Sequence, residues 1–234
     1  MDGLRLGRHP RTVRRGCDRE AGRYPPGVLV VGFDLDMTLV DSRPGIMATL
    51  VVLEAETGAP VATDEMLDAL LRRNLDLEFG DRFDPELATA WSDRFRELYV
   101  DHGVPGTHLL PGARESVAAV RELGGRSIVV TAKYEPNVHR CLEQVGLDVD
   151  AVFGWRYADA KGDTLLDERA SVYVGDTPND VRAATRADAH MIAVTTDPHP
   201  AAELRAAGAT TVLDSLVQFP QWLRRHRESG HLDA

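Results

Sequence analysis

The chain has few of the features that mark disulfide-stabilised or membrane-spanning proteins. Its 234 residues include only two cysteines, Cys17 and Cys141, which are too few for a disulfide framework. No apolar run approaches the roughly 18 residues that a membrane-spanning helix requires. These absences argue against a small secreted scaffold and against a membrane protein. We therefore expect a cytoplasmic protein that has no membrane partner.

Positive charge is also scarce outside one end of the chain. The formal net charge is −10, although residues 1–25 contain seven arginines. An acidic body argues against non-specific binding of nucleic acid, so no nucleic-acid partner is expected. The sequence predicts a disordered basic tail over residues 1–25. A tail that binds RNA or anionic lipid is the alternative, and it would show as salt-sensitive retention that is lost on truncation.

The most informative segment runs from residue 28 to residue 42. A short apolar run leads directly into Asp34 and Asp36, which is typical of a buried strand with carboxylates at its end. Because side chains two apart in a strand point the same way, both carboxylates should face one site. Two neighbouring buried carboxylates require a cation or a proton. The segment therefore predicts a metal site, or a carboxylate that is held protonated.

From residue 107 onward, predicted strands alternate with predicted helices. The strands are expected at 127–131, 151–154, 171–175, 191–194 and 211–213, and a terminal helix at 219–227. This alternation predicts an α/β fold with a Rossmann-like parallel sheet. Polar residues follow the strands: Thr131 and Lys133 after one, Lys161 in the loop after the next, and Asp176 after a third. In a parallel sheet these strand ends converge on one edge.

Residues 43–106 break the alternation and read as helices only, at roughly 44–57, 64–74 and 84–102. We expect a small helical cap inserted after the first strand, with the α/β core formed by residues 26–42 and 107–234. Such a segment at the ligand-binding edge is placed to act as a lid. Its aromatic stripe, which includes Trp91, Phe95 and Tyr99, is expected to be the lid's own core.

The predicted site combines carboxylates, hydroxyls and lysines without soft ligands. Its members are Asp34, Asp36, Thr38, Thr131, Lys133, Lys161, Asp176 and Asp180. Oxygen ligands of this kind suit Mg²⁺, which binds carboxylates together with a substrate phosphate. We expect Thr38 to satisfy a nearby backbone donor and Lys133 to be a solvated loop charge. For Asp180, a purely structural role at the start of its helix remains open.

The sequence resembles the haloacid dehalogenase-like hydrolase superfamily, in particular phosphatases of the phosphoglycolate phosphatase type. The matching pieces are FDLDMTLVDS (33–42), VVT (129–131), Lys161 and VGDTPND (174–180), with LPG (110–112) and ELRAAGA (203–209) in support. The resemblance covers roughly residues 28–225. It implies hydrolysis of a phosphate monoester of a small phosphorylated metabolite. One departure is Met37, which stands where glycine is usual in this group.

The resemblance also implies roles for individual residues. Asp34 would be the nucleophile that forms an aspartyl-phosphate, and Asp36 would be the general acid and base. Thr131 and Lys161 would bind the substrate phosphate, and Lys133 could share that role.

For the metal, the resemblance implies a Mg²⁺ ion as the cofactor. Its ligands would be the Asp34 carboxylate, the Asp36 backbone carbonyl and Asp176. Asp180 would be a further ligand or would support the others, as would Thr38.

Three alternative functions can be compared with the residues of the sequence; one stays open and two are disfavoured. A sugar-phosphate mutase of the β-phosphoglucomutase kind shares the core motifs and is the closest alternative. A phosphonoacetaldehyde hydrolase would need a lysine in the helical cap, but Lys133 and Lys161 are the only lysines in the chain. A non-enzymatic regulator would lack a catalytic residue, and none is missing. The sequence does not indicate the substrate's identity or the oligomeric state.

Overall fold

The computed structural model describes residues 27–196 and 199–229; the predicted tail at 1–25 lies outside these ranges. Six strands form one parallel sheet in the order β5-β4-β1-β6-β7-β8. They are β1 (Val30–Phe33), β4 (Arg126–Val130), β5 (Ala151–Phe153), β6 (Val172–Gly175), β7 (His190–Val194) and β8 (Thr211–Leu213). The predicted α/β fold with a parallel sheet is confirmed.

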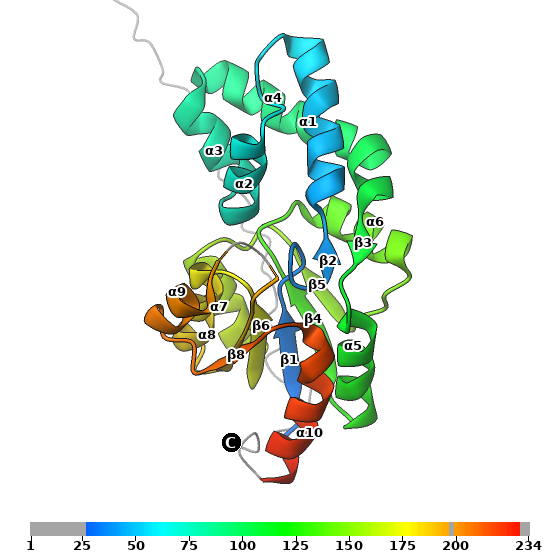
Figure 1. Cartoon of the computed structure of the whole chain (residues 1–234), viewed down its shortest axis with the longest axis vertical. Helices are drawn as coiled ribbons and strands as arrows, with labels where there is room; N and C mark the ends of the chain where they lie inside the picture. Colours follow the sequence, from blue (N-terminus) through cyan, green and yellow to red (C-terminus); the bar gives the residue numbers. More distant parts are fainter. Residues whose placement is uncertain (1–26, 197–198, 230–234) are drawn as a thin grey trace, which may run out of the picture.

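Helices cover both faces of this sheet (Figure 1). One face packs against α5 (Ala113–Glu122), α6 (Glu135–Val145) and α10 (Phe219–Glu228). The other packs against α7 (Asp159–Asp167), α8 (Pro178–Arg186) and α9 (Ala201–Ala206). Strand residues alternate between the two cores, as a sheet buried on both sides requires. None of the helices within the described ranges has both the length and the apolar character needed to cross a membrane.

The helix α7 was not predicted, and the placement of Lys161 in a loop was wrong. Lys161 lies in the first turn of α7 and is buried. The residue before this helix, Ala158, has a positive φ of 50° and offers no side-chain cap. Gly162 follows within the first turn. Apart from Asp159 in the first turn, the usual helix-start signals are therefore missing from this stretch.

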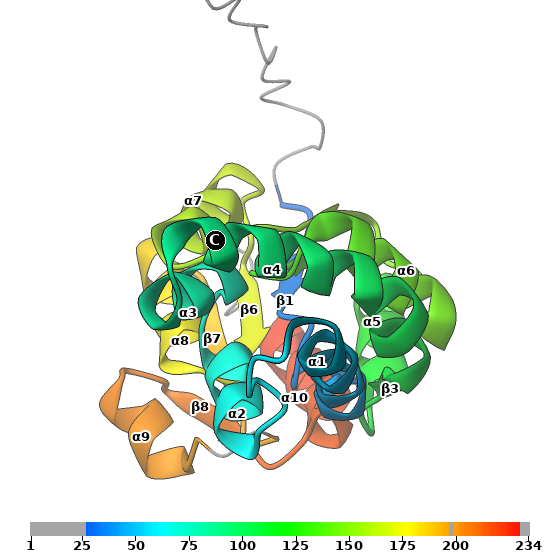
Figure 2. The same cartoon turned by 90° about the horizontal axis from the view of Figure 1, so that it is seen from above.

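Between β2 (Val40–Asp41) and β3 (His108–Leu109) the chain forms helices joined by short loops and no strand, and we call residues 43–106 the helical segment. It comprises α1 (Arg43–Thr57), α2 (Asp64–Arg72), α3 (Leu75–Arg82), α4 (Pro85–Leu98), a π-helical turn (Tyr99–Gly103) and a 3₁₀ turn (Val104–Gly106). The antiparallel β2–β3 pair joins its two ends. Seen from above, the helices lie over the carboxyl edge of the sheet (Figure 2). Helix α3 was missed, and the predicted helix at 84–102 changes to a π-helical turn at Tyr99.

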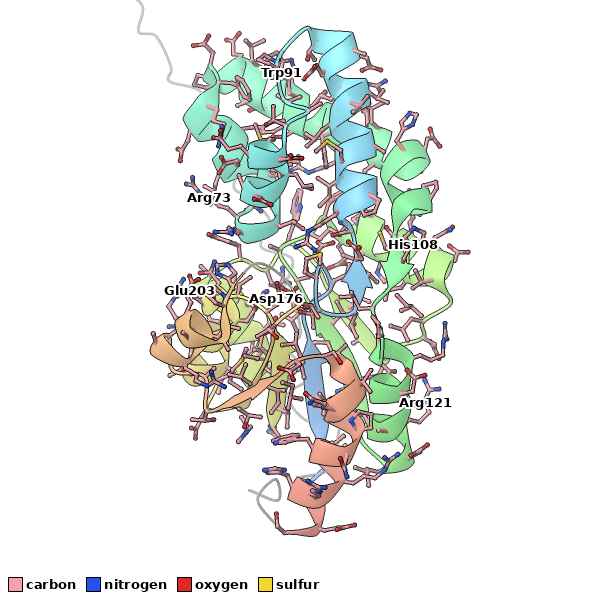
Figure 3. All side chains as sticks on the ribbon, viewed as in Figure 1. Arg73, Trp91, His108, Arg121, Asp176 and Glu203 are labelled. Carbon is pink, nitrogen blue, oxygen red and sulfur yellow. The ribbon has the colours of Figure 1, made fainter. Side chains whose placement is uncertain are left out.

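The aromatic residues of the helical segment divide into two groups. Phe83 lies edge-on to both Phe79 and Trp91, with ring centroids 5.6 and 4.8 Å apart. These three rings belong to the segment's own core, and Figure 3 shows Trp91 at the end of the segment that points away from the sheet. Phe95 and Tyr99 are buried members of the core and also line the cavity between the segment and the sheet. The predicted core role is therefore confirmed for these two residues, but their place in the cavity wall was not predicted.

The base of the helical segment depends on a close backbone contact. A Cβ atom on Gly45, in the first turn of α1, would lie 2.1 Å from the carbonyl oxygen of Gly103. A Cβ atom on Gly103 would lie 2.3 Å from Cδ2 of Tyr99. Only glycine permits α1 and the π-helical turn to approach this closely.

This contact predicts that Gly45→Ala lowers the free energy of unfolding by about 1–3 kcal/mol, since the added methyl group meets backbone. Gly80→Ala is the matched control. Gly80 lies within α3, where a Cβ would meet nothing within 4 Å, so alanine there should stabilise by about 0.5–1 kcal/mol. Urea unfolding measures both changes. Equal effects of the two substitutions would contradict the packing argument.

Candidate active site

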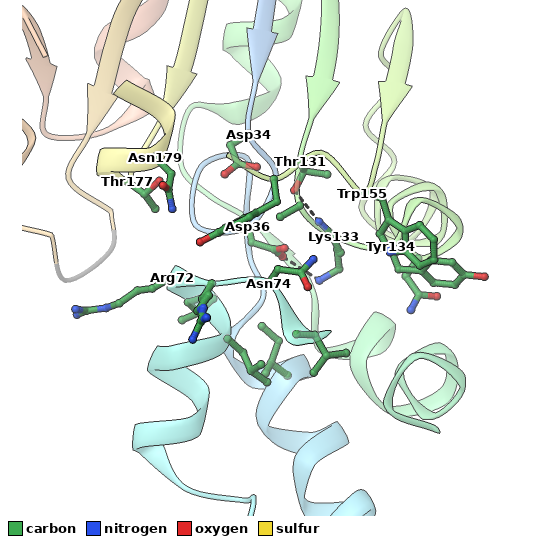
Figure 4. A pocket seen from close by; sticks show the side chains of 18 of the residues that line it. Asp34, Asp36, Arg72, Asn74, Thr131, Lys133, Tyr134, Trp155, Thr177 and Asn179 are labelled. Carbon is green, nitrogen blue, oxygen red and sulfur yellow. Dashed lines mark hydrogen bonds and ion pairs between the residues drawn. The ribbon is translucent and has the colours of Figure 1, made fainter. Parts of the chain in front are cut away.

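The carboxyl ends of the central strands bring together residues that are far apart in the sequence. Asp34 follows β1, Thr131 follows β4 and Asp176 follows β6. Figure 4 shows Asp34, Asp36 and Thr131 side by side at these strand ends. Neighbouring parallel strands β4, β1 and β6 set this arrangement, because their ends lie at the same edge of the sheet.

Asp34 is almost fully buried, and its two carboxylate oxygens have different partners. Oδ1 accepts a hydrogen bond from the Leu35 amide at 2.8 Å, and Oδ2 accepts one from the Lys161 ammonium at 3.0 Å. Burial raises the pKa of Asp34 to about 6, although the charge of Lys161 opposes the rise. A nucleophilic carboxylate at this position therefore requires further positive charge to stay ionised at low pH.

Asp180 holds Lys161 from the other side. Its Oδ1 accepts from Lys161 Nζ at 2.7 Å, while Oδ2 accepts from the backbone amides of Asp176 and Thr177 and from the Thr177 hydroxyl. Burial favours the neutral acid, but Lys161 and Thr177 lower the pKa of Asp180 below its usual range. Thr177 and Asp180 also form a capping box at the start of α8. Asp180 therefore has the capping role that the sequence left open, and it also contacts Lys161 in the site.

Three carboxylates are close enough to share one cation. Oxygens of Asp34, Asp176 and Asp180 lie within 4.8 Å of one another, and all three residues are buried. Lys161 is the cation seen between two of them, so the cluster keeps an excess of negative charge. An all-oxygen donor set with excess negative charge fits a hard divalent cation such as Mg²⁺.

The buried Thr38 supports this cluster. Its hydroxyl donates to Oδ1 of Asp176 at 2.8 Å. The expectation that Thr38 satisfies a local backbone donor is therefore wrong. The bond instead fixes the orientation of a carboxylate that lies across the sheet edge.

Asp36 faces a different cation from Asp34. Its Oδ1 accepts from Lys133 Nζ at 3.0 Å, and Lys133 also donates to the hydroxyl of Tyr99 at 2.9 Å. The Lys133 side chain is only 10% exposed, so the expectation of a solvated loop charge is wrong. Burial alone would lower the pKa of Lys133, but Asp36 and Tyr99 raise it above its usual range.

Met37 shows why glycine is common at this position of the motif. Its φ is 58°, a left-handed conformation that L side chains rarely adopt. The turn is held by hydrogen bonds from Met37 N to the Val40 carbonyl at 2.8 Å and from Leu39 N to the Leu35 carbonyl at 2.9 Å. The side chain is buried. Its apolar burial therefore offsets the strain of the left-handed backbone, which a glycine at this position would not have.

A cavity lies between the sheet edge and the helical segment, with Asp34, Asp36, Thr131, Lys133 and Lys161 in its wall. Asp176, Asp180 and Thr38 are not part of this lining, but Asp180 contacts Lys161 and Thr38 contacts Asp176. Sequence reasoning missed much of the lining: Leu70, Leu71, Arg72, Asn74, Tyr134, Trp155, Thr177 and Asn179. Figure 4 shows Arg72 and Asn74 on the side of the helical segment, opposite Asp34. For Thr177 and Asn179, the signal was their place in VGDTPND; for the others the sequence offers none.

A family model for haloacid dehalogenase-like hydrolases matches residues 31–185, and a HAD-hydrolase-like model matches residues 154–219. The chain belongs to the haloacid dehalogenase-like hydrolase family. The matched region contains every residue of the predicted site. The predicted family is thereby confirmed, and the predicted enzyme class, a phosphatase, is confirmed by this family together with the phosphatase relatives described below.

Individual relatives agree with this family. A phosphoglycolate phosphatase from Photobacterium profundum is 27% identical over 216 residues, covering 82% of this chain and 94% of its own. One from Pseudomonas syringae is 29% identical over 204 residues, covering 74% and 71%. Among solved structures, a predicted phosphatase from Clostridium acetobutylicum matches with a TM-score of 0.73 at 22% identity, covering 85% and 99%. The structure of CbbY from Rhodobacter sphaeroides with phosphate matches at 0.69 and 20%, covering 82% and 96%. These two structures support the fold.

The raised pKa of Asp34 predicts how metal affinity depends on pH. Below about pH 6 the carboxyl group takes up a proton, which competes with a cation. Mg²⁺ affinity should therefore weaken as pH falls, by about five- to sixfold from pH 6 to pH 5. Calorimetric titration of the protein with MgCl₂ measures this change. Asp34→Asn is the control and should remove most of the pH dependence; affinity that is constant from pH 7 to pH 5 would contradict the assignment.

Proposed function

We propose that this phosphatase hydrolyses small phosphate monoesters in a Mg²⁺-dependent reaction that passes through an aspartyl-phosphate on Asp34. The observation that carries the proposal is the buried cluster of Asp34, Asp176 and Asp180 around Lys161. A carboxylate can attack a phosphate dianion only where cations offset the repulsion. This cluster provides one cation and the oxygen ligands for a second.

In the first step, an Asp34 oxygen attacks phosphorus and the alkoxide leaves with a proton from Asp36. In the second step, Asp36 removes a proton from water, which attacks phosphorus, releases inorganic phosphate and restores Asp34. Lys161 already donates to Asp34 and can donate to an equatorial phosphate oxygen from the same place. Thr131, buried at the end of β4, is the hydroxyl that we assign to the phosphate.

Asp34 and Asp176 would hold the metal, together with the Asp36 carbonyl. When bound, Mg²⁺ would neutralise charge on the phosphoryl group. Because both Asp180 oxygens are engaged by Lys161, Thr177 and Asp176 N, we assign Asp180 to orienting its neighbours rather than to the metal itself.

We further propose that the helical segment acts as a lid and selects the substrate. It contributes Leu70, Leu71, Arg72 and Asn74 to the cavity wall that faces the sheet edge. Phosphoglycolate is the first substrate to test, because the relatives named above are phosphoglycolate phosphatases. A carboxylate next to the phosphate would find the Arg72 guanidinium on this wall.

The metal assignment predicts that Asp34→Asn and Asp176→Asn abolish phosphate release, since each substitution removes a carboxylate from the cluster. Phosphate release from a panel of esters, with and without EDTA, measures this. Both variants should keep the fold, which circular dichroism checks. Full turnover in EDTA, or an active Asp34→Asn protein, would overturn the proposed function.

The acid–base assignment predicts that Asp36→Asn lowers kcat/KM for alkyl phosphates by about 10²–10⁴-fold, the usual range for such a group. Nitrophenyl phosphate should lose much less, because nitrophenolate leaves without a proton. Stopped-flow and steady-state assays of the two esters give the comparison. Equal losses for both esters would argue against Asp36 as the acid.

The lid assignment predicts that Arg72→Ala raises KM for phosphoglycolate more than for an alkyl phosphate whose alkyl group carries no charge, by roughly tenfold if one charge-assisted hydrogen bond is lost. Arg205→Ala is the matched control, since Arg205 is exposed on α9 and does not line the cavity. Steady-state kinetics on both esters measure the ratio. An unchanged ratio in Arg72→Ala would remove this residue from substrate selection.

A further inference from the structure

Tyr99 is a buried tyrosine of the helical segment whose ring belongs to the core, but neither the proposed reaction nor a core role accounts for the contact of its hydroxyl. It is 1% exposed and begins the π-helical turn at the base of the segment. Its hydroxyl lies 2.9 Å from Lys133 Nζ, and its ring centroid lies 4.2 Å from the same nitrogen. A single tyrosine thus contacts the ammonium with both its hydroxyl and its ring.

Lys133 also contacts a residue at the sheet edge. Its Nζ lies 3.0 Å from Oδ1 of Asp36. An ammonium has three donors on a flexible stem, so two fixed acceptors on different elements restrict where it can lie. Tyr99, Lys133 and Asp36 therefore form a continuous chain from the helical segment to the carboxylate that the proposed function assigns to proton transfer.

The local backbone keeps Tyr99 in this position. Gly103, one turn later, has no side chain, and a Cβ there would overlap the Tyr99 ring. The carbonyl of Gly103 in turn packs against Gly45 of α1. π-Helical turns are rare and often occur at functional sites. Burial raises the pKa of Tyr99 to about 12, so the hydroxyl stays neutral and can accept a bond from Lys133.

We propose that Tyr99 is a positioning residue for Asp36, acting through Lys133. The inference rests on the proposed function, because it needs Asp36 to be the proton-transfer group. Since Tyr99 belongs to the helical segment and Asp36 to the sheet, the array is complete only when the segment is seated on the sheet edge. When the helical segment packs on the sheet edge, it therefore also aligns Asp36 through Lys133. A misaligned acid slows proton transfer without preventing substrate binding.

The test is Tyr99→Phe, which removes the hydroxyl and keeps the ring. We expect kcat/KM for an alkyl phosphate to fall roughly tenfold, the effect of one hydrogen bond to a charged group. For nitrophenyl phosphate the change should stay within about twofold, because its leaving group needs no acid. The inhibition constant of inorganic phosphate should not move. Because both esters are measured on the same preparation, any loss of folded protein cancels in their ratio.

Tyr134→Phe is the matched control: it removes a hydroxyl from another tyrosine of the cavity wall and should leave the ester ratio unchanged. A double-mutant cycle with Lys133→Met tests the route. If Tyr99 acts through Lys133, adding Tyr99→Phe to Lys133→Met produces no further change in the ratio.

Three outcomes would overturn the inference. The first is an equal loss of kcat/KM for the two esters in Tyr99→Phe, and the second is the same change of the ester ratio in Tyr134→Phe. The third is a double variant, Tyr99→Phe with Lys133→Met, whose change in the ester ratio is the product of the changes in the two single variants. Failure of the proposed function looks different. In that case Asp36→Asn itself shows no dependence on the leaving group. If Asp36→Asn shows the dependence and Tyr99→Phe does not, only the positioning role of Tyr99 fails.

Discussion

The site depends on how negative charge is balanced at the buried edge of the parallel sheet. Asp34, Asp176 and Asp180 lie within 4.8 Å of one another, and Lys161 pairs with two of them. Burying carboxylates together is unfavourable without compensating cations. The capping box of α8, the Thr38 hydroxyl and the first turn of α7 each supply part of that compensation. The remaining excess of negative charge favours a bound cation, and such a cation would offset the repulsion between these carboxylates and a phosphate.

A second ion pair lies toward the helical segment. Lys133 pairs with Asp36 and with the Tyr99 hydroxyl, whereas Lys161 pairs with Asp34 and Asp180. Lys161 faces the assigned nucleophile, and Lys133 faces the assigned acid. This division explains how two aspartates separated by one residue can have different roles, because each is surrounded by different partners.

Much of the architecture could be predicted because it follows from strong local signals. The apolar strands and the polar residues after them placed Asp34, Thr131 and Asp176 at one edge, and the family motif named Lys161. The sequence did not show that Lys161 lies in the first turn of a helix, because Ala158 gives α7 no side-chain cap. The Tyr99–Lys133 contact could not be predicted from the sequence either, since a π-helical turn shifts the side chains out of the α-helical period. Tertiary packing at Gly45 and Gly103, rather than local propensity, decides that geometry.

The central claim is that Asp34 carries the phosphoryl group during turnover. The most direct measurement is a rapid acid quench during the reaction, followed by borohydride reduction, which converts an aspartyl-phosphate to homoserine, and mass spectrometry of the peptides. The account predicts homoserine at position 34, dependent on both substrate and Mg²⁺. Turnover without homoserine at any position, or with homoserine at another aspartate, would contradict it.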